Sequence, residues 1–202
     1  MKNELKPRRL IAVIGKRERL RPALSAAFPA GPGCVILPEA IPCDLSLSIR
    51  DNVRQLRMMI PAEDSARFEA LLALTGLPRH RGWKRPFRGD MTGEKKLYAV
   101  FAAMLPGPET LLIYDALAEM NAAQRAAFGQ MAEQFCGSGS ALVYTASDLK
   151  SVMQLERKQE IWLPGPDSFR KTDAEAIAES SAMLLTPGER NAYYRELEAG
   201  EI

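Results

Sequence analysis

Asp115 is the residue whose position in the sequence most clearly suggests chemistry, because it directly follows the continuous apolar run Leu111-Leu-Ile-Tyr114. Such a run is typical of a strand that is buried on both faces of a parallel sheet. The carboxyl ends of strands in open α/β sheets face the ligand crevice. The sequence therefore predicts that the carboxylate of Asp115 lies where ligands usually bind.

The residues before this strand form a recognisable order of elements. A glycine-containing turn, Gly89 to Gly93, is followed by a predicted helix of about three turns from Glu94 to Met104 and then by a Pro/Gly break. The turn, the helix and the strand ending at Asp115 form the stretch around which the rest of the chain is organised.

A second place for chemistry lies near the N-terminus, where the predicted strand 9–15 ends in Gly15 and a helix is expected over 19–28. A phosphate-binding loop at such a place needs glycines, a lysine and a hydroxyl residue. The corresponding positions hold Leu20, Arg21 and Pro22. Leu20 brings a Cβ where phosphate would approach, and Pro22 supplies neither a hydroxyl nor an N–H. The remaining cations either attract a loose anion or form a solvated basic loop, and the sequence favours the latter.

Together these elements resemble the core of ABC transporter ATPases, from about residue 9 to residue 165. Thr92-Gly-Glu-Lys-Lys96 is similar to the second half of the signature motif, and Pro106 to Asp115 is similar to the approach to Walker B. The departures fall on positions to which the family assigns function. The resemblance implies a vestigial nucleotide site. In it, Met91 replaces the signature serine, Ala116 the catalytic glutamate, Ser147 the switch histidine and Glu39 the Q-loop glutamine. The residues of this vestigial site are Gly15, Leu20, Arg21, Pro22, Glu39, Met91, Gly93, Asp115, Ala116 and Ser147.

The repeated order of short strand, loop and helix predicts an α/β fold with a mainly parallel sheet flanked by helices. The resemblance adds a P-loop NTPase architecture with a truncated β-subdomain, because few residues separate Arg21 from Glu39. It also adds a helical subdomain at about 54–92, within an ABC ATPase-like domain over 1–165. A C-terminal helical extension is expected over 166–202, and strands are expected at 10–14, 34–37, 111–114, 141–145 and 160–163.

Two stretches are candidates for partner binding. Residues 45–53 resemble the segment after the Q-loop, and residues 79–87 combine arginines with aromatic residues, a composition typical of interface hot spots. The family implies that a groove between them accepts a membrane subunit. An alternative interpretation is that the aromatic side chains belong to the core and the charges are solvated. The candidate partner-binding residues are Asp51, Asn52, Arg79, Trp83 and Phe87.

Composition limits the remaining possibilities. A chain of 202 residues with 47% hydrophobic content can form one core, and a net charge of +2 gives no strong attraction to nucleic acid. No apolar run is long enough for a membrane span. The three cysteines are widely separated and the single histidine, His80, has no catalytic neighbours in the sequence, so neither a disulfide framework nor a metal site is indicated.

The leading hypothesis is a catalytically inactive ABC ATPase-like subunit of a membrane transport complex, cytoplasmic and peripheral at the inner face of the membrane. Its expected partner is an ABC permease or an intact ABC ATPase subunit, in a homodimer or heterodimer, and it would need no cofactor. A second hypothesis is a weak ATPase or nucleotide sensor that uses ATP, Mg²⁺, Asp115 and the basic loop. A third is an unrelated α/β protein. The element Asp51-Asn-Val53 and the C-terminal extension suit the phospholipid-transport branch of the MCE type.

Overall fold

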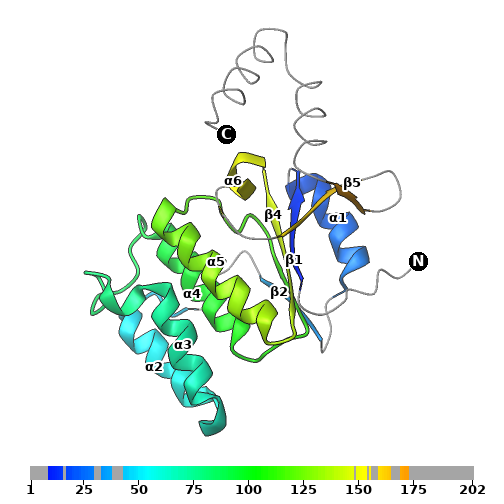
Figure 1. Ribbon diagram of the computed structural model, residues 1–202. Coiled ribbons are helices and arrows are strands. Elements are labelled where there is room, and N and C mark those ends of the chain that lie inside the picture. The colour runs from blue at the N-terminus through cyan, green and yellow to red at the C-terminus, as the bar shows by residue number, and fades with distance from the viewer. Residues whose placement is uncertain are drawn as a thin grey trace.

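The computed structural model describes residues 9–15, 17–29, 33–37, 43–147, 149–153, 155, 159–164 and 169–172. Their strands form one six-stranded sheet in the order β2-β3-β4-β1-β5-β6 (Figure 1). The strands are β1 (Leu10–Ile14), β2 (Cys34–Leu37), β3 (Thr110–Ile113), β4 (Ala141–Ala146), β5 (Glu160–Pro164) and β6 (Phe169–Thr172).

The sheet is mainly parallel, as the sequence predicts. All neighbouring pairs from β2 to β5 are parallel, and only β6 runs antiparallel, along β5. Strand β3 begins and ends one residue before the predicted limits. Strand β6 lies at the beginning of the segment 166–202, where the sequence predicts a helical extension. A four-residue strand that reads Phe-Arg-Lys-Thr carries little periodic signal of its own.

The helices follow the expected alternation with the strands, and among the described residues side-chain caps are found at the N-termini of two of them. Ser48 caps α2, and Asn121 forms with Gln124 the predicted capping box of α5. The helices are α1 (Arg17–Ala27), α2 (Ile49–Met59), α3 (Ser65–Thr75), α4 (Thr92–Met104), α5 (Ala122–Gly137) and α6 (Leu149–Met153), with short 3₁₀ turns η1 (Ala62–Asp64) and η2 (Leu77–Arg79).

Two hydrophobic clusters place these helices on opposite faces of the sheet. Along β1, Ile11 and Val13 pack with α1, whereas Leu10 and Ala12 belong to the larger cluster with α4 and α5. This alternation is the period-two pattern of a strand buried on both faces. Figure 1 shows α1 on one side of the sheet, and α4 and α5 on the other, with α2 and α3 outside them.

The outer helical layer is held to α4 by aromatic contacts. The ring centroids of Phe68 in α3 and Phe101 in α4 are 5.2 Å apart, and those of Phe87 and Tyr98 are 5.6 Å apart. This layer includes most of the stretch 54–92, for which the sequence predicts a helical subdomain. The residue limits of the domain and its extension stay predictions, and residues 173–202 lie outside the described part. Among the described residues, no helix combines the length and apolar character needed to cross a membrane.

Candidate functional site

The candidate site lies at the carboxyl end of β3, where Asp115 borders a cavity of about 340 Å³. Asp115 has a positive φ of 49°, which is uncommon for a residue with a side chain. Its N–H donates to the Thr145 hydroxyl over 2.8 Å, and the next N–H, of Ala116, donates to the Thr145 carbonyl over 3.3 Å. Strand β4 therefore fixes the turn that carries the carboxylate.

A cation from the same chain faces this carboxylate. The guanidinium of Arg17, at the start of α1, lies 3.9 Å from the carboxylate of Asp115 and 5.4 Å from the centre of the Tyr114 ring. Both charged side chains are partly buried. The position at which a carboxylate would hold a metal ion is therefore next to a fixed positive charge.

Lys96 supports the same turn from α4. Its ammonium group donates to the carbonyls of Asp115 over 3.2 Å and of Ala118 over 2.6 Å, and it lies 3.9 Å from the carboxylate of Glu119. Burial lowers the pKa of Lys96, and the nearby carboxylates of Glu119 and Asp115 oppose that change. Because its donors are directed at backbone oxygens, Lys96 acts here as a cap for the turn.

The segment after β1 has a different shape from a phosphate-binding loop. Helix α1 already begins at Arg17, so residues 17–20 are helical and do not form a wide loop. Leu20 is fully buried, and a Cβ on Gly15 would lie 3.2 Å from its side chain. Arg21 and Pro22 lie inside α1 and are exposed. The space next to Gly15 is therefore filled by an aliphatic side chain.

These residues do not fit ATP and Mg²⁺ in the way that a P-loop holds them. A P-loop surrounds the phosphates with backbone N–H groups and supplies a lysine and a hydroxyl. Here Leu20 occupies the space beside Gly15, neither group is supplied at the expected positions, and Arg17 pairs with Asp115.

Two of the residues that correspond to the signature motif, Met91 and Gly93, lie in the packed interior. Met91 is buried, and its sulfur accepts the N–H of Arg88 over 3.4 Å. Gly93 is also buried, and a Cβ at this position would collide with the side chain of Gln124. A side chain at this position would therefore displace the amide of Gln124 at the beginning of α5.

The structure brings together only part of the predicted nucleotide site. Asp115 and Ala116 line the cavity, and Gly15 contacts Leu20. Ser147 is exposed directly after β4, and Glu39 lies outside the described residues. The sequence reasoning did not single out Arg17, Lys96 or Thr145 as neighbours of Asp115. Only the position of Thr145 at the end of a predicted neighbouring strand could have indicated such a contact.

The partner-binding candidates divide into buried and accessible residues. Asn52 is 1% exposed and binds the backbone of the preceding loop, accepting the N–H of Asp44 and donating to the carbonyls of Asp44 and Ser48. Phe87 is 6% exposed against Tyr98. Their side chains stabilise the fold and are not accessible to a partner.

The other three candidates remain at the surface to different degrees. Trp83 is half-buried and packs against the core, while Arg79 is exposed. Asp51 accepts the Ser48 hydroxyl over 2.5 Å, and this hydrogen bond, together with the nearby arginines, holds the pKa of its carboxyl below the usual value.

Comparisons with known proteins agree with the architecture. No family model matches the sequence, and neither does any curated protein. The chain is similar to a solved structure described as an ATP binding subunit of an ABC transporter, with a TM-score of 0.61 and 15% sequence identity over 96% of this chain and 89% of the other. This likeness shows that the chain has the fold of an ABC ATPase subunit.

Proposed function

We propose that the chain is a catalytically inactive ABC ATPase-like subunit of a membrane transport complex. It acts as a structural or regulatory partner of a permease or of an intact ATPase. The observation that carries the proposal is the early start of α1 at Arg17, which leaves no wide loop after Gly15 and brings a guanidinium to Asp115.

The chemistry of phosphoryl transfer supports this proposal. Such catalysis consists almost entirely of positioning and electrostatic stabilisation of the phosphoryl group, so each part of the site contributes directly. This chain has Leu20, Arg21 and Pro22 in place of the loop residues and Ala116 in place of the catalytic glutamate. A fold that keeps its core but loses these groups retains surfaces for binding other subunits.

A second candidate function is weak nucleotide binding. It is favoured by the cavity beside Asp115, whose lining includes the cations Arg17 and Lys96 and the hydroxyl residue Thr92. A ligand with phosphate groups could interact with these cations if Arg17 moved away from Asp115.

The experiment that separates the two measures ATP hydrolysis and binding of fluorescently labelled ATP with Mg²⁺, with wild type and the Asp115→Asn variant side by side. The proposal predicts hydrolysis at the background rate and no saturable binding for either protein. Activity or binding that wild type shows and Asp115→Asn loses would overturn it. Activity equal in both proteins would come from a contaminating ATPase.

The cellular placement is part of the proposal. We place the chain at the inner face of the membrane, bound to a permease or paired with another ATPase subunit, and a role in phospholipid transport of the MCE type would suit the Asp51-Asn-Val53 element. Co-expression with a candidate permease, followed by affinity purification in mild detergent, tests the assembly. Recovery of the chain without the permease would contradict the partnership tested.

A further inference from the structure

The turn between η2 and α4 carries an unusual excess of positive charge. Residues 79–88, called here the arginine turn, contain no acidic residue. Within the described part of the chain, only Arg88 of its cations has an ion-pair partner, Asp90 at 3.3 Å. The cations of the turn are all exposed: Arg79, Arg81, Lys84, Arg85 and Arg88.

The backbone of the arginine turn is held in place from two sides. Phe87 packs against Tyr98, and the first N–H groups of α2, from Ile49 and Arg50, donate to the carbonyls of Arg85 over 2.9 Å and Trp83 over 3.0 Å. The cations are therefore displayed from a fixed scaffold. A fixed scaffold reduces the entropy that a partner must overcome on binding.

The surface at the turn is concave. A cavity of about 420 Å³ is lined by Arg81, Arg85 and Arg88, and also by Asp90 and Glu94. Guanidinium groups bind carboxylates through paired hydrogen bonds of defined geometry. Asp90 and Glu94 lower the positive charge of this cavity, so it offers separate guanidinium groups instead of the dense positive charge that nucleic acid or an anionic membrane favours.

Helix α2 continues this surface away from the turn. Arg54 and Met58 follow Arg50 at four-residue spacing, so the three residues share one face of the helix. Both arginines also lie beside the carboxylate of Asp51, at 3.4 Å from Arg50 and 3.6 Å from Arg54, so among the described residues of this surface the cations of the arginine turn supply most of the unpaired positive charge. Met58 and Met59 are 86% and 78% exposed. Arginine and methionine are both enriched at protein interfaces, where lysine is depleted, and methionine adapts to irregular partners.

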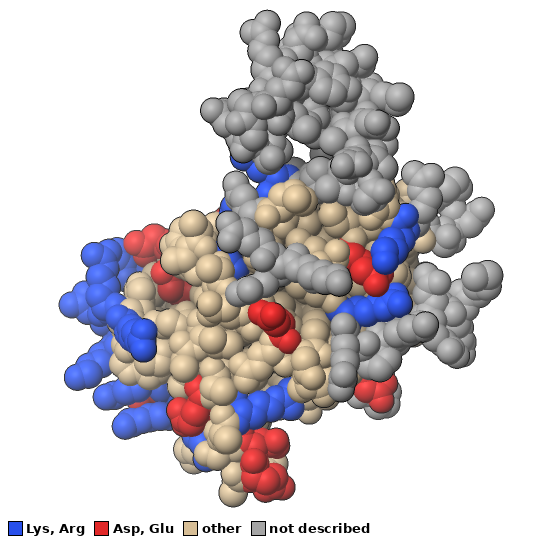
Figure 2. Space-filling view, viewed as in Figure 1, with Lys and Arg blue, Asp and Glu red and all other residues tan. Residues whose placement is uncertain are grey.

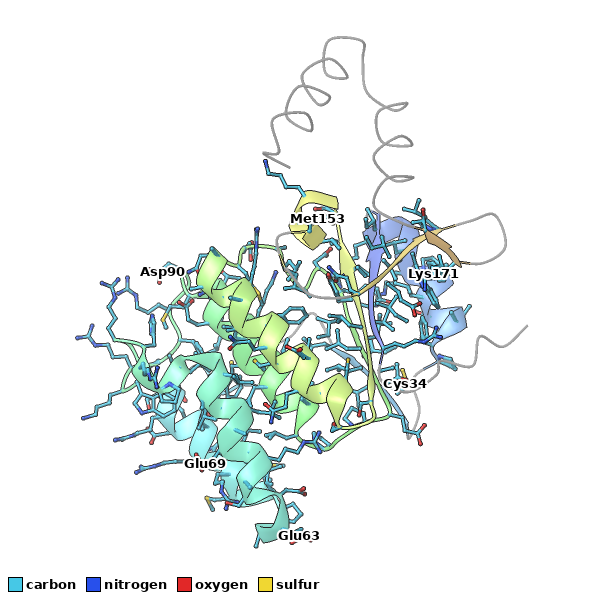
Figure 3. All side chains as sticks on the ribbon, in the orientation of Figure 1. Cys34, Glu63, Glu69, Asp90, Met153 and Lys171 are labelled. Carbon is cyan, nitrogen blue, oxygen red and sulfur yellow. The ribbon has the colours of Figure 1, made fainter. Side chains whose placement is uncertain are left out.

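Most of the cations on the helical layer lie along one edge of it. Figure 2 shows the blue side chains gathered along the edge formed by α2 and the arginine turn. Figure 3 places Glu63 and Glu69 toward the opposite end of the layer from Asp90. The basic edge is therefore a distinct patch on a chain whose net charge is only +2.

We infer that the arginine turn and the outer face of α2 bind an acidic segment of a partner polypeptide, rich in Asp and Glu. The guanidinium groups hold its carboxylates, and Met58 and Met59 contact apolar side chains between them. The inference rests on the proposed function, because that function supplies the partner. Binding at this surface does not depend on whether the chain hydrolyses ATP.

The test uses the full chain and a short fluorescein-labelled peptide in which glutamate alternates with leucine, with a glutamine peptide as control. Fluorescence anisotropy is measured at low and at physiological ionic strength. We expect Arg81→Gln/Arg85→Gln to weaken binding of the acidic peptide roughly five- to tenfold, because two exposed ion pairs are lost. The matched variant Lys150→Gln/Lys171→Gln removes the same charge from exposed sites on α6 and β6, and should change binding less than twofold.

Each further outcome decides the inference. Equal weakening by the two double variants would mean that only overall charge matters, and would overturn it. Stronger binding to phosphatidylglycerol vesicles or to single-stranded DNA than to the acidic peptide would also overturn it and assign the patch to a phosphate-bearing surface. If Arg81→Gln/Arg85→Gln lowers the melting temperature, Arg79→Gln/Lys84→Gln replaces it, with the same expected loss. None of these outcomes depends on the ATPase measurement.

Discussion

The guanidinium of Arg17 lies 3.9 Å from the carboxylate of Asp115, so the residue that ends β3 is paired with the residue that begins α1. Both side chains are partly exposed, and an ion pair of this kind contributes about 0.2–1 kcal/mol to stability. The position of the ion pair matters more than its energy, because the guanidinium of Arg17 puts a positive charge where a metal ion would otherwise approach the carboxylate.

A double-mutant cycle measures this contact. We expect Arg17→Gln and Asp115→Asn each to lower the free energy of unfolding only slightly, with a coupling energy of about 0.5 kcal/mol that decreases as salt is added. Asparagine is chosen because it tolerates the positive φ at this position. Urea unfolding at two salt concentrations gives the coupling. A coupling that is zero at low salt would show that the two groups do not interact in solution.

Restoring the motif residues should not restore the loop. In Leu20→Gly/Arg21→Lys/Pro22→Ser, the loss of a fully buried side chain costs about 3–5 kcal/mol, and the relief of Pro22 inside α1 offsets at most about 3 kcal/mol. We therefore expect a lower melting temperature and no thermal shift with ATP and Mg²⁺. The control Arg21→Lys/Pro22→Ser keeps Leu20 and should fold at least as well as wild type. ATP-dependent stabilisation of the triple variant would contradict our view of α1.

Helix α1 begins at Arg17, two residues before the predicted start at residue 19, and this difference shows what a sequence pattern can and cannot reveal. The apolar run of β1 and the break at Gly15 predict a strand followed by a helix, and both form. The exact start of the helix depends on Leu20 entering the core beside Gly15, which is a tertiary contact without a local signal. Substitutions at motif positions could be read from the sequence, but the replacement of the loop by a helical turn could not.

The partner-binding residues illustrate the same limit. Asn52 reads as a surface residue, yet it is buried because the chain turns back so that residues 44–48 can bind its amide. Arg81 and Arg85 are exposed, as is usual for arginine. Which polar residue becomes part of the core depends on loop geometry that composition does not encode.

Thr145 gives a test of the turn at Asp115. Its side chain is fully buried, and the hydroxyl oxygen accepts the N–H of Asp115 over 2.8 Å. Thr145→Val keeps the shape but leaves that N–H without its acceptor, so we expect a loss of about 1–3 kcal/mol in the free energy of unfolding. Thr145→Ser keeps the hydroxyl and should lose less. Equal stability of the valine variant and wild type would mean that the hydrogen bond does not hold the turn.

Gly93 and Gln124 should be energetically coupled. A methyl group at Gly93 would displace the side chain of Gln124, whose amide oxygen accepts the N–H of Asn121 over 2.9 Å. We expect Gly93→Ala to cost about 0.5–1.5 kcal/mol, the value of one such hydrogen bond. In the Gln124→Ala background the same change should be neutral or slightly stabilising, because alanine favours the helix. A full cost in both backgrounds would place the collision elsewhere.

The thiol of Cys136 gives the chain a predictable response to alkaline pH. Burial raises the pKa of Cys136 from 9.0 to about 11, and a backbone hydrogen bond from Leu142 opposes this change only in part. The thiol also donates to the carbonyl of Arg9 over 3.3 Å, a hydrogen bond that only its protonated form can make. Below about pH 8 the thiol is protonated in both the folded and the unfolded chain, and its contribution to stability is complete. Between about pH 9 and 11 the unfolded chain loses this proton more readily, so stability is lost as the pH rises.

The measurement compares urea unfolding of wild type and Cys136→Ala from pH 7.5 to 10.5. We expect the alanine variant to show a shallower decline in stability, whatever its absolute stability, because it lacks this ionisation. Cys34→Ala is the control, since Cys34 is only half-buried and burial raises the pKa of its thiol without the larger effect seen at Cys136. The pKa of Tyr98, which burial raises to about 12, adds a decline of the same sign at higher pH in all three proteins. Identical slopes for wild type and Cys136→Ala would show that this thiol ionises equally in the folded and unfolded chain.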